Sequence, residues 1–253
     1  MAITQSNALT LYRVSVCMAT HNGERFIRRQ METILAQLAP NDEMVISDDS
    51  STDRTLEIIR SFVDSRIRLF TGNTFFSPTF NFENALRQAQ GDIIVLADQD
   101  DIWLDNKVMV IRERFTQAPS GPYLMALDGY VVDDVDQVTE DSIFARLHVG
   151  TGFWRNVFKN RYIGCCLAFS RDLLTAALPF PRRIPMHDMW LGQLCALVGT
   201  VEFVPVRTIR YRRHAASRTE FLRIRFRPWL QIRRRFFLVA HLLGRSLWYR
   251  WVR

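Results

Sequence analysis

Three aspartates follow a short apolar run in the segment VLADQDD, residues 95–101. An ionised carboxylate at the end of a buried strand is costly unless it is paired or bound to a cation. Because side chains two residues apart on an extended chain point to the same side, Asp98 and Asp100 can face one ligand. Carboxylate oxygens suit Mg²⁺ or Mn²⁺, and such an ion can hold a diphosphate. The alternative is a solvated turn in which Asp101 caps a helix that begins at Ile102.

Two further polar clusters follow apolar runs earlier in the chain, THNG at 20–23 and DDSSTD at 48–53. Asp and Ser side chains at the end of a strand can accept hydrogen bonds, for example from a ribose or a base. They can also cap the next helix, here through Ser51 or Thr52. The DDSSTD cluster is too acidic to cradle a phosphate by itself, and it lacks the Gly-Lys pair of a P-loop.

Regular elements must bring these three clusters together. Strand-like and helix-like segments alternate in the first half of the chain, with strands at 13–20, 43–47, 66–70 and 92–97 and helices at 24–38, 55–63 and 80–90. This alternation predicts an α/β fold with a mainly parallel, Rossmann-like sheet flanked by helices. Ligands bind such sheets in the crevice beyond the carboxyl ends of the strands, where all three clusters fall.

The second half is less regular. The sequence indicates strands at 123–134, 201–206 and 208–214, an apolar run at 162–169, a proline-rich loop at 179–185, and helices at 171–178 and 187–198. The short segment MHDMW begins the last of these helices, and Asp188 could serve there simply as a helix cap.

Three stretches resemble family 2 glycosyltransferases of the GT-A fold: VSVCMATHNGERFI, MVISDDSSTDRTLEII and GDIIVLADQDDIWLDNK. Their order and spacing fit that family, and the DQDDIW form is similar to its bacterial rhamnosyltransferase-like members. The fit continues more loosely to residue 217. The resemblance implies metal-dependent, inverting transfer of a sugar such as rhamnose from dTDP-rhamnose to a saccharide acceptor. The alternative donor is a UDP-hexose or UDP-N-acetylhexosamine.

The resemblance also assigns donor-binding roles. Thr20 and Asn22 would lie beside the donor nucleotide, Asp49 would contact its base or ribose, and Asp98 would help to hold the diphosphate. His21 stands where the family more often has an aromatic or another polar residue.

The metal-binding and phosphate-binding roles fall on two segments. Asp100 would bind the Mn²⁺ or Mg²⁺ ion, and His214 would be a further ligand. Arg212 or Arg213 would meet a phosphate. Ser217 departs from the asparagine that the family often has there, and the alternative for 211–217 is a basic loop that leads into the tail.

Asp188 matches the position at which the family has its general base. Inverting transfer is a direct displacement, so a base must accept the proton of the acceptor hydroxyl as the new bond forms. Five further residues would lie on the acceptor side: Asp101, Asp128, Gly164, His187 and Trp190. A cysteine nucleophile is not expected at Cys165 or Cys166, because inversion needs no covalent step.

Positive charge is concentrated at the end of the chain. The 253 residues carry +7 in total, but residues 220–253 hold nine arginines and one glutamate, which gives them +8 and leaves −1 for the rest. This distribution argues against nucleic-acid binding by the domain. We therefore expect a GT-A domain at 1–219 and a basic, aromatic, amphipathic helical tail at 220–253.

The tail has no apolar stretch long enough to span a bilayer, but its mixture of arginine and aromatic residues suits the surface of an anionic membrane. The alternatives are a helical pair packed on the domain, with arginines reaching to solvent, and nucleic-acid binding. A membrane site would fit a lipid-linked acceptor in the synthesis of O-antigen or capsule-type polysaccharide.

The location expected from the sequence is the cytoplasm, peripherally on the cytoplasmic face of the inner membrane. No signal-peptide pattern opens the chain. The four cysteines match no zinc or disulfide pattern, so we expect buried thiols in a reducing compartment. The alternative to an enzyme is a membrane-associated binding protein that has the fold without the chemistry, and turnover of a donor would distinguish the two.

Overall fold

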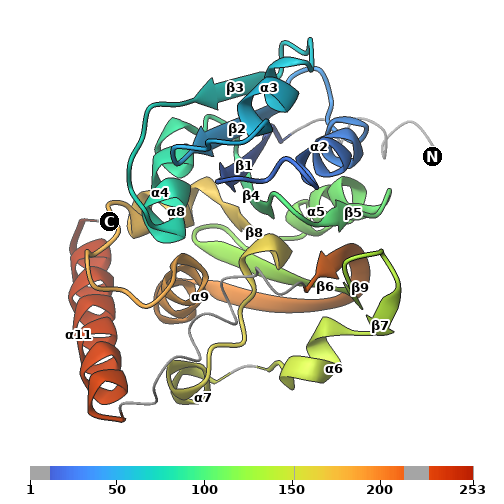
Figure 1. Cartoon of the computed structure of the whole chain (residues 1–253). Coiled ribbons are helices and arrows are strands. Elements are labelled where there is room, and N and C mark those ends of the chain that lie inside the picture. Colours follow the sequence, from blue (N-terminus) through green and yellow to red (C-terminus); the bar gives the residue numbers. More distant parts are fainter. Residues whose placement is uncertain (1–11, 151, 214–227, 253) are drawn as a thin grey trace.

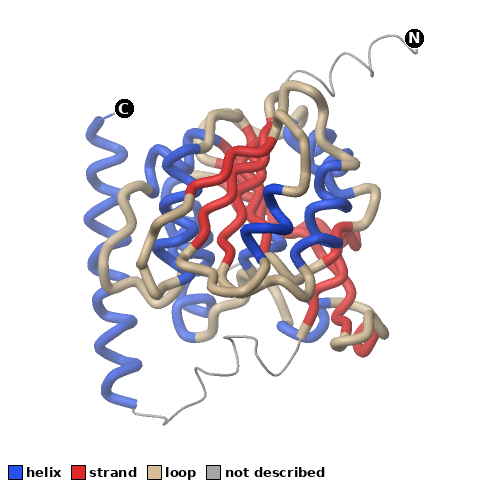
Figure 2. The backbone as a smooth tube through the Cα atoms, turned by 45° about the horizontal axis from the view of Figure 1, so that its top comes forward, coloured by secondary structure: helices blue, strands red, loops and turns tan. Residues whose placement is uncertain are grey.

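The computed structural model describes residues 12–150, 152–213 and 228–252 (Figures 1 and 2). Its strands are β1 (Val14–Thr20), β2 (Glu43–Asp48), β3 (Ile67–Phe70), β4 (Ile93–Asp98), β5 (Ile102–Trp103), β6 (Tyr123–Val132), β7 (Val138–Glu140), β8 (Leu167–Ser170) and β9 (Thr200–Arg212). All of these strands join one sheet, which runs through the middle of the molecule with helices on both sides (Figure 2). His214 and the segment 214–227 lie outside the described residues.

The helices follow the strands closely along the chain. They are α2 (Ile27–Leu35), α3 (Thr55–Arg60), α4 (Pro78–Gln88), α5 (Lys107–Phe115), α6 (Ile143–Leu147), α7 (Phe153–Phe158), the 3-10 turn η1 (Gly164–Cys166), α8 (Arg171–Ala177), α9 (His187–Val198) and α11 (Pro228–Val252). The α/β prediction is confirmed.

The strand order is β3-β2-β1-β4-β8-β6-β9-β5, with β7 paired to β6. Strands β1 to β4 are parallel to one another, as the alternation of strands and helices predicts. The second half adds antiparallel pairs of β8 with β4 and β6, of β5 with β9, and of β7 with β6. The sheet is therefore mixed as a whole, and its parallel half ends in the three polar clusters.

The alternation of side chains along the strands builds a core on each face of the sheet. Val14, Val16 and Met18 of β1 pack in one apolar cluster with residues of α2, α3 and α5. Cys17, between them, packs on the other face with residues of α4, α8 and α9. Burying a side chain of this size stabilises the fold by about 1.5–3 kcal/mol, so one strand ties both layers together.

The structure differs from the sequence-based expectation directly after the DQDD motif. Ile102 and Trp103 form the short strand β5, antiparallel to β9, so Asp101 does not cap a helix beginning at Ile102. The next helix, α5, begins at Lys107. The two strands predicted at 201–206 and from 208 onward form one strand, β9, which ends at Arg212 and whose register with β6 shifts near Asp128.

In the part of the tail that the structure describes, residues 228–252, a helix packs on the domain. The helix α11 runs along α9 and also touches α7 and α8 (Figure 1). Leu238 and Leu242 are fully buried against these helices. Arg235, Arg245 and Arg250 donate hydrogen bonds to backbone carbonyl oxygens of the domain. None of the helices in the described part of the chain is long and apolar enough to cross a membrane.

Leu242→Ala tests whether α11 is part of the folded domain. Leu242 is fully buried whereas its neighbour Leu243 is 49% exposed, so Leu243→Ala is a matched control. We expect Leu242→Ala to lower the free energy of unfolding by about 2–5 kcal/mol and the control to change it by less than about 1 kcal/mol. Urea denaturation measures both. Equal, small effects would mean that α11 does not pack on the domain in solution.

Candidate functional site

The three polar clusters meet at the carboxyl ends of β1, β2 and β4. In the parallel register Thr20 lies opposite Asp48, and Ala19 lies opposite Asp98. The side chain of Gln99 connects two of the clusters, because its Nε2 donates to the His21 carbonyl (2.9 Å) and its Oε1 accepts from the His21 N–H (3.0 Å).

Gly23 completes this contact between the clusters. A Cβ at Gly23 would overlap the Gln99 side-chain amide, so a larger residue there would have to displace this amide from its contact with the THNG turn. Gln99 has no predicted role from the sequence. The sequence offers one indication of such a role: Gln99 places an amide, which can both donate and accept hydrogen bonds, between Asp98 and Asp100.

The residues predicted to contact the nucleotide also hold the loops around them. Thr20 Oγ1 donates to Asp48 Oδ1 (2.8 Å). The Asp49 carboxylate accepts from the backbone N–H of Phe75 (2.6 Å) and of Ser77 (3.1 Å), and so fixes the loop before α4.

Asn22 has φ of 48° and is exposed at the sheet edge. Its Oδ1 accepts from the Thr52 N–H (2.8 Å), which joins the THNG turn to the DDSSTD cluster. The helix-capping alternative for Ser51 and Thr52 is not what the structure shows. Helix α3 begins at Thr55, whose N–H donates to Asp53 Oδ1 (3.0 Å).

Residues 98–101, which we call the DQDD turn, are held at several points. Gln30 Nε2 donates to the Asp98 carbonyl oxygen (2.8 Å). Arg212 donates through its backbone N–H to Asp101 Oδ1 (2.9 Å) and through Nε to the Asp100 carbonyl oxygen (2.8 Å). The guanidinium of Arg212 is buried, pairs with Asp136 and lies 4.6 Å from the centre of the Phe26 ring. Arg212 therefore positions the turn, and contact of Arg212 or Arg213 with a phosphate stays a prediction.

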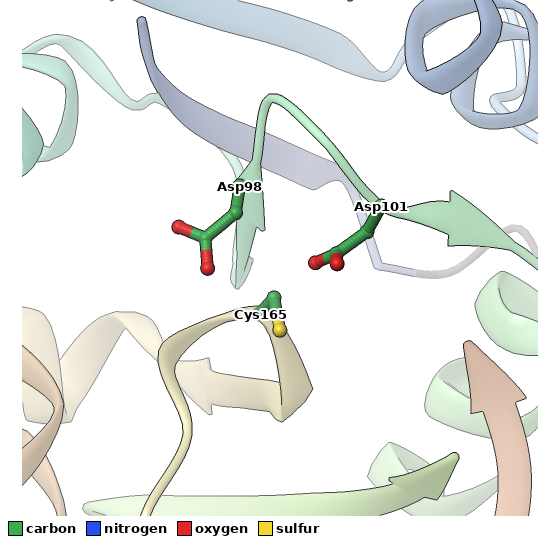
Figure 3. Close-up of side chains that lie close together, drawn as sticks. All are labelled: Asp98, Asp101 and Cys165. Carbon is green, nitrogen blue, oxygen red and sulfur yellow. The ribbon is translucent and has the colours of Figure 1, made fainter. Parts of the chain in front are cut away.

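Asp98, Asp101 and Cys165 come together at this turn (Figure 3). One carboxylate oxygen of Asp98, one of Asp101 and the Cys165 Sγ all lie within 4.8 Å of one another. Burial, followed by repulsion from Asp100 and Asp188, raises the pKa of Asp98 to about 7. Burial and the nearby Asp100 and Asp98 raise the pKa of Asp101 well above its usual value.

Lys107 supplies a positive charge beneath these carboxylates. It is fully buried, and burial lowers its pKa. Its Nζ donates to the Cys165 carbonyl oxygen (2.7 Å) and lies 4.4 Å from the centre of the Trp103 ring. A buried lysine needs such partners, because an isolated ammonium loses its hydration without compensation.

The donor atoms of the DQDD turn fit a divalent cation. Asp101 is 1% exposed, and its Oδ2 has no hydrogen-bond partner among the described residues. A bound divalent cation would offset the repulsion that raises the pKa of Asp98 and of Asp101. From the sequence, Asp100 is predicted to bind the metal and Asp101 to lie on the acceptor side. In the structure Asp101 lies beside Asp98, and Asp100 is near enough to raise the pKa of both.

Asp188 lies in the first turn of α9, near the DQDD turn. Burial raises its pKa to about 6, although hydrogen bonds from the Met189 and Gly164 backbone and from Asn160 Nδ2 (3.0 Å) act in the opposite direction. Its charge contributes to the raised pKa of Asp98, so the two carboxylates lie close together. A carboxylate with this pKa is ionised at pH 7 and remains basic enough to accept a proton.

His187 lies directly before Asp188 and is 4% exposed. Its ring packs on Phe82 with 4.2 Å between the centroids, and burial lowers its pKa to about 3, so it is neutral at pH 7. Neither ring nitrogen has a hydrogen-bond partner within the part of the chain that the structure describes. A Cβ at Gly164 would lie 2.8 Å from His187 Nε2, so glycine allows η1 to pack against this ring.

The other two residues predicted for the acceptor side are engaged in the interior. Trp190 is fully buried and donates from Nε1 to the Ala177 carbonyl oxygen (3.1 Å). The Asp128 carboxylate accepts from the Phe144 N–H (3.0 Å) and from Ser142 Oγ (2.7 Å), which fixes the start of α6. Contact of either with an acceptor stays a prediction.

The fold is shared with solved structures of two proteins. TarS residues 1–349 from S. aureus, in complex with UDP-GlcNAc, align with a TM-score of 0.64 and 16% identity over 82% of this chain and 60% of that chain. The mannosyltransferase PcManGT from Pyrobaculum calidifontis, in complex with GDP-Man and Mn²⁺, aligns with a TM-score of 0.60 and 18% identity over 95% and 73%. The predicted GT-A fold is confirmed.

The chain belongs to glycosyl transferase family 2, whose model matches residues 15–176. One relative is the UDP-Glc:alpha-D-GlcNAc-diphosphoundecaprenol beta-1,3-glucosyltransferase WfgD of Escherichia coli, 36% identical over 97 residues, or 38% of each chain. Another is the dTDP-rhamnosyl transferase RfbG of Shigella flexneri, 37% identical over 98 residues, or 36% of this chain and 34% of that one. Both matches span little more than a third of the relative. The family recognised from the three motifs is confirmed.

Gln99→Leu tests whether the contact between the THNG turn and the DQDD turn sets the geometry of the site. The substitution removes both hydrogen bonds to His21, each worth about 0.5–1.5 kcal/mol. We expect the affinity for Mn²⁺, measured by calorimetry in the presence of nucleotide, to fall by about tenfold. Gln117→Leu, at an exposed position, is the control. An unchanged affinity in Gln99→Leu would show that the turn holds its shape without this contact.

Proposed function

We propose that this chain is an inverting, metal-dependent glycosyltransferase that moves a sugar from a nucleotide-diphosphate donor to a saccharide acceptor. The observation that carries the proposal is the position of Asp188 opposite the DQDD turn. A buried carboxylate with a pKa of about 6 lies beside a carboxylate cluster that suits a divalent cation. The carboxylate cluster lies at the carboxyl end of the parallel strand β4, where α/β sheets bind their ligands, and Asp188 is near enough to raise the pKa of Asp98.

The proposed chemistry divides between the two groups. Asp188 accepts the proton of the acceptor hydroxyl as that oxygen attacks the sugar carbon from the face opposite the leaving group. The bond between the sugar carbon and the diphosphate oxygen breaks in the same step. A bound Mn²⁺ or Mg²⁺ would stabilise the negative charge of the departing nucleotide diphosphate. Asp98, Asp100 and Asp101 would hold that ion, and His214 stays a further predicted ligand outside the described residues.

For the donor we propose dTDP-rhamnose, because the DQDDIW form resembles rhamnosyltransferases and RfbG is named a dTDP-rhamnosyl transferase. A UDP-hexose or UDP-N-acetylhexosamine is the alternative, since WfgD is named for UDP-Glc. The proposed acceptor is a lipid-linked saccharide in the synthesis of a surface polysaccharide. The name of WfgD, which specifies a diphosphoundecaprenol-linked acceptor, supports this class.

A lipid-linked acceptor would require contact with a membrane, and α11 offers a surface for it. The face of this helix that turns away from the domain exposes apolar and aromatic side chains: Phe236, Leu243, Leu247, Trp248, Trp251 and Val252. Arg233 and Arg234 are exposed on the same helix. Exposed aromatic residues beside arginines suit the interface of an anionic bilayer. We propose that the chain sits peripherally on the cytoplasmic face of the inner membrane through this surface.

Asp188→Asn tests the proposed base. The amide cannot accept the proton, so we expect transfer to fall by about 10²–10⁴-fold while nucleotide affinity changes by less than about threefold. In the parent, the rate should fall as the pH drops below about 6, because Asp188 is then protonated. Sugar transfer is measured by chromatography of the product, and affinity by calorimetry.

Asp141→Asn, at an exposed aspartate before α6, is the matched control and should transfer sugar at the parental rate. Parental turnover by Asp188→Asn would show that Asp188 is not the base. If the parent turned over no nucleotide sugar at all, a binding protein without the chemistry would replace the enzyme.

Leu247→Glu together with Trp251→Glu tests the membrane surface. These side chains are 67% and 85% exposed, so the substitutions should leave the fold intact. We expect binding to vesicles that contain phosphatidylglycerol to fall by at least about tenfold, since two apolar contacts are replaced by two repelled charges. Vesicle flotation measures the binding. Val63→Glu is the control, because Val63 is also exposed but lies outside α11. Equal flotation of the double variant and the parent would contradict the assignment.

A further inference from the structure

We propose that Cys165 supplies a sulfur ligand to the divalent cation at the DQDD turn, together with Asp98 and Asp101, and that the site therefore prefers thiophilic ions to Mg²⁺. The proposal rests on the cation-dependent function proposed above and adds to it a ligand from outside the DQDD motif. Cys165 belongs to η1, more than 60 residues further along the chain.

The geometry of the three side chains carries the proposal. The Cys165 Sγ and one oxygen from each of Asp98 and Asp101 lie within 4.8 Å of one another. Metal–sulfur and metal–oxygen bonds of about 2.0–2.3 Å place ligand atoms roughly 3–4 Å apart, so a small contraction would close the set around one ion. In Figure 3 the Asp101 carboxylate points toward Asp98 and Cys165.

The unpartnered oxygen of Asp101 is a second, independent observation. Oδ1 accepts from the Arg212 N–H, whereas Oδ2 is buried and has no hydrogen-bond partner among the residues described. Leaving a buried carboxylate oxygen unsatisfied is costly, and native proteins usually satisfy such atoms. A cation between the three side chains would provide the missing partner.

The backbone around Cys165 is fixed, which keeps its sulfur beside the carboxylates. Lys107 Nζ donates to the Cys165 carbonyl oxygen, and the backbone N–H of Cys166 donates to the Ile163 carbonyl oxygen (3.0 Å). Cys165 is itself fully buried. Contacts with α5 and within η1 therefore hold the backbone of Cys165 in place.

Sulfur changes which ions the site would accept. Carboxylate oxygens alone suit Mg²⁺ and Mn²⁺, whereas a thiolate favours softer ions such as Zn²⁺ and Co²⁺. As the metal–sulfur bond forms, the thiol proton of Cys165 passes to solvent, because a coordinating thiol is deprotonated.

Titration of the purified full-length chain with Co²⁺ alone tests the proposal. A cobalt–thiolate bond gives a charge-transfer absorption band in the near ultraviolet, which oxygen ligands do not give. We expect the parent to show this band, Cys165→Ser and Cys165→Ala to lose it, and Cys166→Ser to keep it. Zn²⁺ should displace Co²⁺ at a concentration at least about tenfold lower than Mg²⁺ does.

A variant in which Cys17, Cys166 and Cys195 are all replaced by serine should keep the band, and it tests the proposal without altering Cys165. Co²⁺ bound without the band, or a band that persists in both Cys165 variants, would overturn the sulfur ligand and leave the cation-dependent function standing. Dialysis measures the bound Co²⁺ independently of the band. Absence of bound Co²⁺, even with nucleotide present, would overturn the sulfur ligand and the cation-dependent function together.

Discussion

Repulsion among the three carboxylates of the DQDD turn is the constraint on which the rest of the site depends. Burial and repulsion from neighbouring carboxylates disfavour the ionised forms of Asp98 and Asp101, which raises the pKa of both. Such a cluster stays together only if its backbone is held and its charge is offset. Gln30, Gln99 and Arg212 hold the backbone. The buried Lys107 offsets part of the charge, and the remainder suits a divalent cation.

The short turn η1 joins the two sides of the site. Lys107 donates to the Cys165 carbonyl oxygen, and the Gly164 backbone forms a hydrogen bond with Asp188. The three-residue turn η1 therefore contacts both Lys107, which lies beside the carboxylate cluster, and Asp188, the proposed base. In a direct displacement, the base and the groups that hold the leaving diphosphate must both be correctly placed around the sugar carbon. A rigid connection between Asp188 and the DQDD turn helps to maintain that placement.

Local patterns predicted the parallel half of the fold. The apolar segment at Val14–Thr20 and the helix at His187–Val198 could be recognised from residue types within their own length. The strand Ile102–Trp103 could not, because its pairing depends on β9, about 100 residues further along the chain. The approach of Cys165 to the DQDD turn could not be predicted for the same reason, because it joins distant parts of the chain. The burial of Lys107 could not be predicted either, because lysine is usually exposed.

The central claim is that the DQDD turn holds a cation that in turn holds a nucleotide diphosphate. Calorimetric titration of the purified chain with UDP, dTDP and GDP, each with and without Mn²⁺, tests it most directly. The account predicts that one of the three binds, that binding needs Mn²⁺, and that Asp100→Ala abolishes it. Binding of none of them, or binding that is equally tight without Mn²⁺ and in Asp100→Ala, would contradict it.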